Sequence, residues 1–121
     1  MKFLSLVISD QLANRKILNH ILVSHCTLIN KSSIDEAIDW LSKNESPDVI
    51  LLDVIVPTIN KLDFLYSLHS LKEKKPYVIV FSDTENYIDK INFSNMGAEG
   101  YLLKPIIPEE LITQIFKSSI L

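Results

Sequence analysis

Residues 47–57 read PDVILLDVIVP and give the clearest indication of the fold. Four apolar residues, Val49–Leu52, stand side by side and lead directly into Asp53. Apolar residues that are continuous rather than alternating are typical of a strand buried on both faces in a parallel sheet. We therefore predict a central strand with helices packed on both of its faces and a carboxylate at its carboxyl end.

Further short apolar runs, rich in β-branched or aromatic residues, are predicted to be strands: Phe3–Ile8, Cys26–Ile29, Tyr77–Phe81 and Tyr101–Leu103. Between the runs, and after the last one, apolar residues recur at the spacing of amphipathic helices. Ser33 and Glu36 have the spacing of a capping box at the start of one such helix. Because strand–helix–strand crossovers are right-handed, we predict an α/β fold. It is a doubly wound parallel sheet of about five strands in the order 2-1-3-4-5, as in flavodoxin-like proteins.

The composition is that of one globular domain, and the 121 residues are predicted to form a single unit, 1–121. Hydrophobic residues make up 47% and charged residues 22%, which argues against a disordered chain. A net charge of -3 argues against nonspecific DNA binding. The single cysteine, Cys26, cannot form an internal disulfide, and no apolar run approaches bilayer length. We expect a cytoplasmic domain that contacts neither membrane nor nucleic acid directly.

Polar side chains stand where the predicted strands end. They are Ser9 and Asp10 after the first strand, Asp53 after the third, Ser82 and Asp83 after the fourth, and Lys104 after the fifth. The carboxyl ends of parallel strands meet at one edge of a doubly wound sheet, where ligands bind. We therefore expect carboxylates, a hydroxyl and an ammonium group to meet in one crevice.

Two motifs now carry a resemblance to a known family. Residues 47–57, PDVILLDVIVP, resemble the third-strand motif of two-component receiver domains, and residues 97–105, GAEGYLLKP, resemble their fifth-strand motif. With the end of the first strand and Ser82 in register, the resemblance spans essentially the whole chain. It implies a phosphorylation switch rather than an enzyme, apart from catalysis of its own Mg²⁺-dependent phosphorylation and dephosphorylation. It also implies a histidine kinase or phosphotransfer protein as the phosphoryl donor.

The resemblance also implies roles for individual residues. Asp53 matches the phosphoacceptor, a carboxylate nucleophile, and Lys104 matches the lysine that offsets the charge of the phosphoryl oxygens. Mg²⁺ is the implied cofactor, with Asp10, Asp53 and the backbone carbonyl of Ile55 as ligands and Ser9 as a contact through water. Mg²⁺ binds through one or two carboxylates and keeps several waters, so this set provides enough charge.

A switch and a partner surface are implied as well. Ser82 matches the hydroxyl that moves toward the phosphoryl group, and Tyr101 matches the aromatic residue that reports the movement. The Lys104–Pro105 bond matches a cis peptide of the family. In this family, partners dock on the face of the fourth helix, fifth strand and fifth helix, which here carries Tyr87 and Asn95. A downstream protein, an attached effector domain or a second copy in a homodimer are the expected partners.

Three residues depart from the family pattern. Ser9 replaces the first of two adjacent acids, so we expect weaker metal binding. Lys61 stands where a glycine is usual, which predicts a reshaped loop. Asp83 replaces a small residue. It could restore the missing acid, repel the phosphoryl donor, or cap a helix that starts near Thr84.

Other functions compete with the switch. The departures suit a degenerate receiver that acts as a phosphorylation-independent interaction module. A haloacid-dehalogenase-type phosphatase needs an acid two residues beyond its nucleophile, where this chain has Ile55. A flavin site needs a phosphate cradle that the residues of 9–14 do not supply. Ile55 is predicted instead to shield an acyl phosphate from water.

Overall fold

The computed structural model describes residues 3–54, 63–68, 74–83 and 86–118. The strands are β1 (Phe3–Ile8), β2 (Cys26–Lys31), β3 (Val49–Val54), β4 (Tyr77–Ser82) and β5 (Gly100–Leu103). The helices are α1 (Leu12–Leu22), α2 (Ile34–Lys43), α4 (Tyr87–Asn95) and α5 (Pro108–Lys117), and residues 63–68 are helical as well.

All pairings in the sheet are parallel, and the strand order is β2-β1-β3-β4-β5, as predicted. The predicted end of the third strand is two residues short, because β3 continues through Asp53 and Val54. These two residues lie opposite Phe81 and Ser82 of β4. The apolar run stops at Asp53 in the sequence, whereas the pairing of the backbone continues past it. β2 likewise extends beyond its apolar residues to Lys31.

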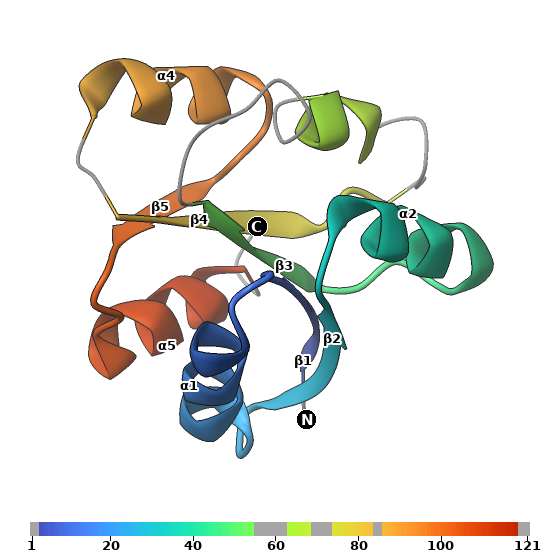
Figure 1. Cartoon of the computed structure of the whole chain (residues 1–121), viewed down its shortest axis with the longest axis horizontal. Coiled ribbons are helices and arrows are strands. Elements are labelled where there is room, and N and C mark those ends of the chain that lie inside the picture. The colour runs from blue at the N-terminus through green and yellow to red at the C-terminus, as the bar shows by residue number, and fades with distance from the viewer. Residues whose placement is uncertain (1–2, 55–62, 69–73, 84–85, 119–121) are drawn as a thin grey trace.

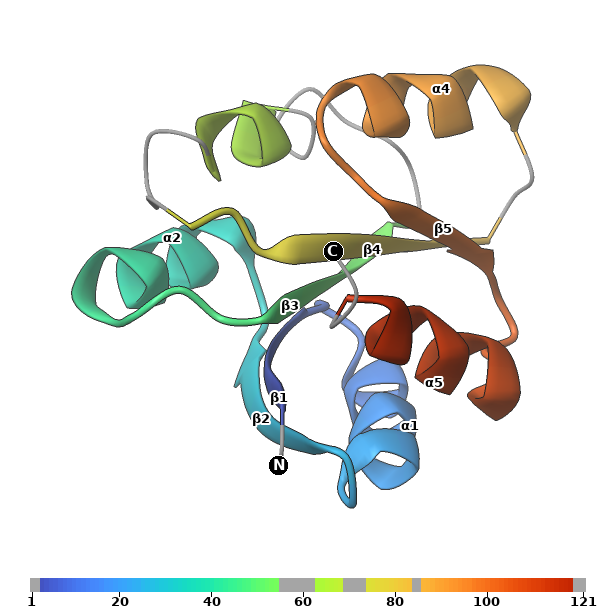
Figure 2. The same cartoon turned by 180° about the vertical axis from the view of Figure 1, so that it is seen from behind.

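Helices cover both faces of the sheet. Figure 1 shows α1 and α5 on one face and α2, residues 63–68 and α4 on the other, and Figure 2 shows the same layers from behind. Alternate residues of β3 separate into the two cores: Leu51 packs with α1 and α5, whereas Ile50 and Leu52 pack with the other layer. Each strand residue therefore has a face fixed by its position, which explains the continuous apolar run.

The helix ends follow local capping chemistry. Ser33 caps α2, and its Oγ accepts a hydrogen bond of 3.1 Å from the backbone N–H of Glu36, as the capping box predicts. Pro108 occupies the first turn of α5. α4 is followed by Gly97, whose φ of 113° lies in the left-handed region that glycine adopts most readily. These residues define where α2 and α5 begin and where α4 ends.

Some predicted positions fall outside the described residues, among them Ile55, Lys61 and Thr84. Phe64, in helical residues 63–68, is buried against the sheet. Within the described helices, none has both the length and the apolar character needed to cross a bilayer.

Candidate functional site

Asp53 lies near the carboxyl end of the central strand β3 and is only 7% exposed. Leu51, two residues earlier, packs in the core beneath α1 and α5. Because side chains alternate along a strand, the carboxylate of Asp53 points to the same face. An acid that would otherwise be solvated is therefore held at the edge of a core, in front of the first turn of α1.

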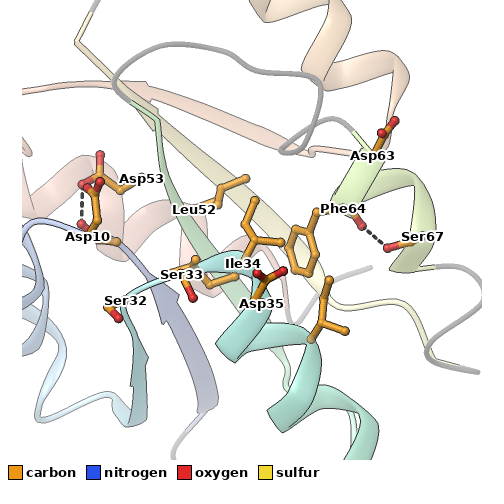
Figure 3. A pocket seen from close by; sticks show the side chains of 13 residues that line it. Asp10, Ser32, Ser33, Ile34, Asp35, Leu52, Asp53, Asp63, Phe64 and Ser67 are labelled. Atoms are coloured by element: carbon orange, nitrogen blue, oxygen red, sulfur yellow. Dashed lines mark hydrogen bonds between the residues drawn. The ribbon is translucent and has the colours of Figure 1, made fainter.

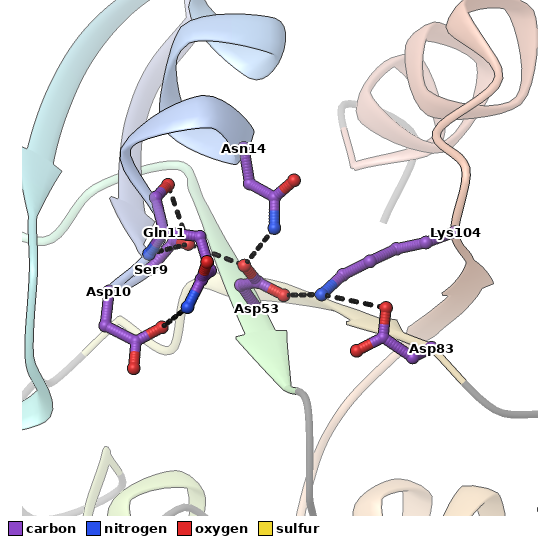
Figure 4. A network of polar contacts seen from close by, with 7 residues as sticks. All are labelled: Ser9, Asp10, Gln11, Asn14, Asp53, Asp83 and Lys104. Carbon is purple, nitrogen blue, oxygen red and sulfur yellow. Dashed lines mark hydrogen bonds and ion pairs between the residues drawn. The ribbon is translucent and has the colours of Figure 1, made fainter.

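Three side chains contact the Asp53 carboxylate (Figure 4). Lys104 forms an ion pair with Oδ1 through its Nζ. Ser9 donates a hydrogen bond to Oδ2 from its Oγ at 2.5 Å. Asn14 donates a second hydrogen bond to Oδ2 from its Nδ2 at 2.9 Å. Both oxygens of the carboxylate are therefore engaged by side chains of the protein.

The pKa of Asp53 results from opposing effects. Burial alone raises this pKa, because an ionised carboxylate loses its hydration. Hydrogen bonds from Lys104, Ser9 and Asn14, together with the charge of Lys104, outweigh burial and lower the pKa below its ordinary value. Asp53 is therefore an ionised, buried carboxylate at neutral pH, the form that acts as a nucleophile or binds a cation.

Ser9 is held in place from several directions. It is buried, and its Oγ accepts a hydrogen bond of 3.1 Å from the backbone N–H of Gln11. Its backbone carbonyl accepts a hydrogen bond of 2.5 Å from Nη1 of Arg15. The Gln11 contact occupies a lone pair of the hydroxyl, and the hydroxyl proton is directed to Asp53.

Asp10 lies beside this cluster and is exposed. Its Oδ1 accepts a hydrogen bond of 3.3 Å from Nε2 of Gln11. Asp10 and Asp53 both line a cavity of about 680 Å³ that extends to Ile34 in the first turn of α2 and to Phe64 (Figure 3). The two carboxylates predicted as metal ligands therefore face one cavity.

Asp83 lies beside Lys104, at the edge where the strand ends were expected to meet. Its Oδ1 lies 3.6 Å from Nζ of Lys104, on the far side of that ammonium group from Asp10 (Figure 4). The prediction that Asp83 caps a helix near Thr84 is wrong, because α4 begins at Tyr87. Asn86 is its cap and accepts hydrogen bonds from two backbone N–H groups of the first turn.

Sequence alone does not indicate the roles of Asn14, Gln11 and Arg15. They lie in the loop after β1 and the first turn of α1, a segment that lacks the pattern of a phosphate cradle. The signal was present: Leu51 and Asp53 share a face of the sheet, and α1 covers that face. A polar residue in the first turn of α1 therefore lies within reach of Asp53.

Comparison with known sequences identifies the family. Residues 6–116 match the response regulator receiver domain family. The chain belongs to this family. Such receiver domains are parts of two-component response regulators, and the family predicted from the two strand motifs is confirmed.

Relatives and solved structures agree with this assignment. The receiver domain is 32% identical over 93 residues to the nitrate/nitrite response regulator protein NarL of Escherichia coli, covering 77% of this chain and 43% of NarL. It is 40% identical over 76 residues to the uncharacterized transcriptional regulatory protein YxjL of Bacillus subtilis, covering 62% of this chain and 34% of YxjL. The chain thus spans less than half the length of these relatives.

Two solved structures share the fold at low sequence identity. A response regulator from Thermotoga maritima superposes with a TM-score of 0.87 at 20% identity, covering 98% of each chain. The chemotaxis protein CheY4 of Vibrio cholerae has a TM-score of 0.82 at 21% identity, covering 98% of this chain and 99% of CheY4. The predicted flavodoxin-like fold is confirmed.

The two predicted switch residues lie on neighbouring strands of the receiver domain. Ser82 is fully buried at the end of β4, and its backbone carbonyl accepts a hydrogen bond of 2.9 Å from the N–H of Lys104. Tyr101 in β5 is half-buried, with its ring 6.3 Å from that of Phe93 in α4. The peptide bond between Lys104 and Pro105 is cis, as the motif predicted.

The donor set of the receiver fits the cation of its family. Receiver domains generally bind Mg²⁺ at their acidic site. Within residues 3–54, 63–68, 74–83 and 86–118, no three His, Cys, Asp or Glu side chains group into a metal site. Asp10 and Asp53 nevertheless suffice in charge, because Mg²⁺ uses one or two carboxylates and retains water. Its third expected ligand, the carbonyl of Ile55, lies outside the described residues.

Proposed function

We propose that this receiver domain is a phosphorylation-dependent switch in a two-component phosphorelay and that Asp53 accepts the phosphoryl group. The observation that carries the proposal is the ion pair of buried Asp53 with Lys104 at the carboxyl end of β3. A buried carboxylate with a lowered pKa and a cation beside it is suited to attack a phosphoryl group whose charge must be offset.

The transfer step involves few groups. An oxygen of Asp53 bonds to phosphorus, the bond from phosphorus to the imidazole nitrogen of a phosphohistidine donor breaks, and the imidazole takes up a proton. Lys104 then interacts with the phosphoryl oxygens in place of Oδ1 of Asp53. Mg²⁺, when bound, adds positive charge against the phosphoryl oxygens. Asp10 and Asp53 would hold it, together with the carbonyl of Ile55 and Ser9 through water.

Phosphorylation is proposed to alter the partner surface through β4, β5 and α4. The hydroxyl of Ser82 donates to the phosphoryl group, and Tyr101 changes position in response. Tyr87 is 75% exposed on α4, and Asn95 at the end of that helix is also exposed. The face of α4, β5 and α5 is proposed to bind a downstream protein, an attached effector domain or a second receiver in a homodimer. We place this switch in the cytoplasm, with a histidine kinase or phosphotransfer protein as donor.

A phosphodonor experiment tests the proposal. The protein is incubated with acetyl phosphate or beryllofluoride and Mg²⁺, and the adduct is followed by mass spectrometry or by amide NMR shifts. The wild type is expected to respond and Asp53→Asn to stay unchanged. Asp39→Asn is the matched control, because Asp39 pairs with Lys43 on the exposed side of α2. A response in Asp53→Asn equal to that of the wild type contradicts the proposal.

A degenerate receiver is the second candidate. It is favoured by the hydrogen bonds of Ser9 and Asn14 to Asp53, which engage Oδ2 without a cation or phosphoryl group. In that case the domain binds its partner in one fixed state. No response of the wild type to acetyl phosphate or to beryllofluoride at saturating Mg²⁺ would favour this interaction module over the switch.

A further inference from the structure

Oδ2 of Asp53 has its hydrogen-bonding capacity filled by two neutral donors. Ser9 Oγ lies 2.5 Å from it and Asn14 Nδ2 lies 2.9 Å from it. A carboxylate oxygen offers about two lone pairs, so both are in use. Oδ1 is paired with Lys104.

Both donors bind Oδ2, the carboxylate oxygen on the side of Ser9 and Asp10 (Figure 4). Ser9 precedes Asp10 in the chain, and Asn14 lies in the first turn of α1. Lys104 approaches from the opposite side of the carboxylate (Figure 4). Oδ2 is therefore the oxygen that a cation shared with Asp10 has to reach.

The donors are held there by the surrounding backbone. Gln11 N–H donates to Ser9 Oγ at 3.1 Å, and Arg15 Nη1 donates to the carbonyl of Ser9 at 2.5 Å. Asn14 directly precedes Arg15 in α1, so the helix backbone fixes the position of its side chain. A cation that binds Oδ2 therefore has to displace donors that other hydrogen bonds hold in place.

We propose that Ser9 and Asn14 compete with the divalent cation for Oδ2 of Asp53. They thereby set the Mg²⁺ concentration at which the site is loaded. The inference rests on the proposed function in that it assigns the cation to Asp53. A hydrogen bond to a charged group corresponds to about a tenfold change in an equilibrium constant, part of which water recovers. Each donor is thus able to shift the loading of the site severalfold.

The test is a Mg²⁺ titration without any phosphodonor. Metal-stripped protein is titrated while NMR follows the backbone amides and the side-chain NH₂ groups. Asn14→Ala is expected to lower the Kd by about threefold to tenfold, because a competing donor to the carboxylate is gone. Asn14→Asp is expected to lower it further, because a carboxylate replaces the donor. In the wild type, the Asn14 NH₂ resonances should shift on saturation as the bond to Oδ2 breaks.

Asn19→Ala is the matched control, because Asn19 lies in the same helix but bonds to Asn30 of β2. Its Kd should equal that of the wild type. Equal Kd values for wild type, Asn14→Ala and Asn14→Asp, or the absence of Mg²⁺ binding in all of them, overturn the inference. A domain that is phosphorylated on Asp53 yet shows equal Kd values contradicts the inference alone. The expected Kd shifts in a domain that never accepts a phosphoryl group contradict the proposed function alone.

Discussion

Ser9, the residue after β1, and Asp53, near the end of β3, share a hydrogen bond of 2.5 Å from Ser9 Oγ to Asp53 Oδ2. β1 and β3 are parallel, and Ile8 lies opposite Leu52 in their register. The next residue of each chain segment therefore emerges at the same edge and on the same face. Where receivers usually carry an acid, this chain has a neutral hydroxyl that donates a hydrogen bond to the proposed phosphoacceptor instead of repelling it.

Lys104→Met is expected to raise the pKa of Asp53 in the metal-free protein. Burial raises this pKa, and the hydrogen bond and charge of Lys104 are among the effects that lower it. In the wild type the folded-state pKa lies below 3.8, so ionised Asp53 contributes stability above about that pH and loses it as the pH falls through the folded value. Carboxyl NMR titration measures the pKa, and urea unfolding measures the stability. Both are followed from about pH 3 to about pH 7, the range in which carboxyl groups titrate.

The control for this change is Lys43→Met. Lys43 pairs with Asp39 at 3.0 Å, but both side chains are about two-thirds exposed, at 68% and 66%. Exposed pairs contribute about 0–1 kcal/mol, so little pH-dependent change is expected. An unchanged Asp53 titration in Lys104→Met contradicts the assignment of Lys104 as the partner that keeps Asp53 ionised.

Asp83→Asn is expected to speed phosphorylation by acetyl phosphate. Asp83 lies 3.6 Å from Lys104 Nζ and is partly exposed, so it both shares that ammonium group and repels an anionic donor. An interaction of about 1 kcal/mol in a watery environment corresponds to roughly a fivefold change in rate at low salt. The difference should shrink at high ionic strength because salt screens exposed charges.

Mg²⁺ affinity distinguishes this reading from the one in which Asp83 restores the missing acid. Because Asp83 lies on the Lys104 side of the carboxylate, Asp83→Asn is expected to leave the Mg²⁺ Kd unchanged. Glu45→Gln controls for net charge, because Glu45 is an exposed acid that precedes β3 and takes no part in the site. A weaker Mg²⁺ affinity in Asp83→Asn alone would restore the compensation hypothesis, and a slower reaction would rule out repulsion.

Leu51→Ala is expected to destabilise the domain by about 2–5 kcal/mol, because it leaves a cavity in a packed core. Leu51 is fully buried in the central strand, two residues before Asp53. Leu12→Ala is the matched control, since Leu12 is 56% exposed at the start of α1 and should change stability by about 0.5 kcal/mol or less. Urea unfolding compares the two variants, and equal losses would contradict the buried position of Leu51.

The sequence predicted the order of the sheet because each strand carries its own apolar run and the crossovers allow few topologies. It predicted Asp53, Asp10 and Lys104 as neighbours because they follow parallel strands that end at one edge. The end of β3 was placed too early, because Asp53 interrupts the apolar run while its backbone still pairs with Phe81.

Side-chain partners were harder to predict than strand ends. Asn14 binds Asp53 only because α1 lies on the face to which Asp53 points, and that depends on the pleat of β3. A helix cap is one of the three roles that the sequence allows Asp83, and it rests on the general preference of short acids for such positions. The chain also has Asn86 three residues later, directly before the apolar residues of α4.

Asn86→Ala is expected to destabilise the domain by about 0.5–2 kcal/mol through loss of the α4 cap. Its Oδ1 accepts hydrogen bonds of 3.0 Å and 3.1 Å from the backbone N–H groups of Ile88 and Asp89. Phe93 is the buried residue of α4, so this helix has little other apolar contact to hold its first turn. The loss should therefore appear first as faster amide hydrogen exchange at the start of α4.

Two further variants separate the cap from its alternatives. Asn95→Ala changes the same residue type at the other end of α4, where Asn95 is exposed, and should leave exchange in the first turn unchanged. Asp83→Ala should also leave it unchanged, because the capping bonds come from Asn86. Faster exchange in Asp83→Ala with none in Asn86→Ala would mean that the helix begins earlier than Tyr87.

Because α4 forms part of the proposed partner face, its first turn also reports whether phosphorylation of Asp53 reaches that face. Amide protection there should change with the phosphodonor in the wild type and stay constant in Asp53→Asn.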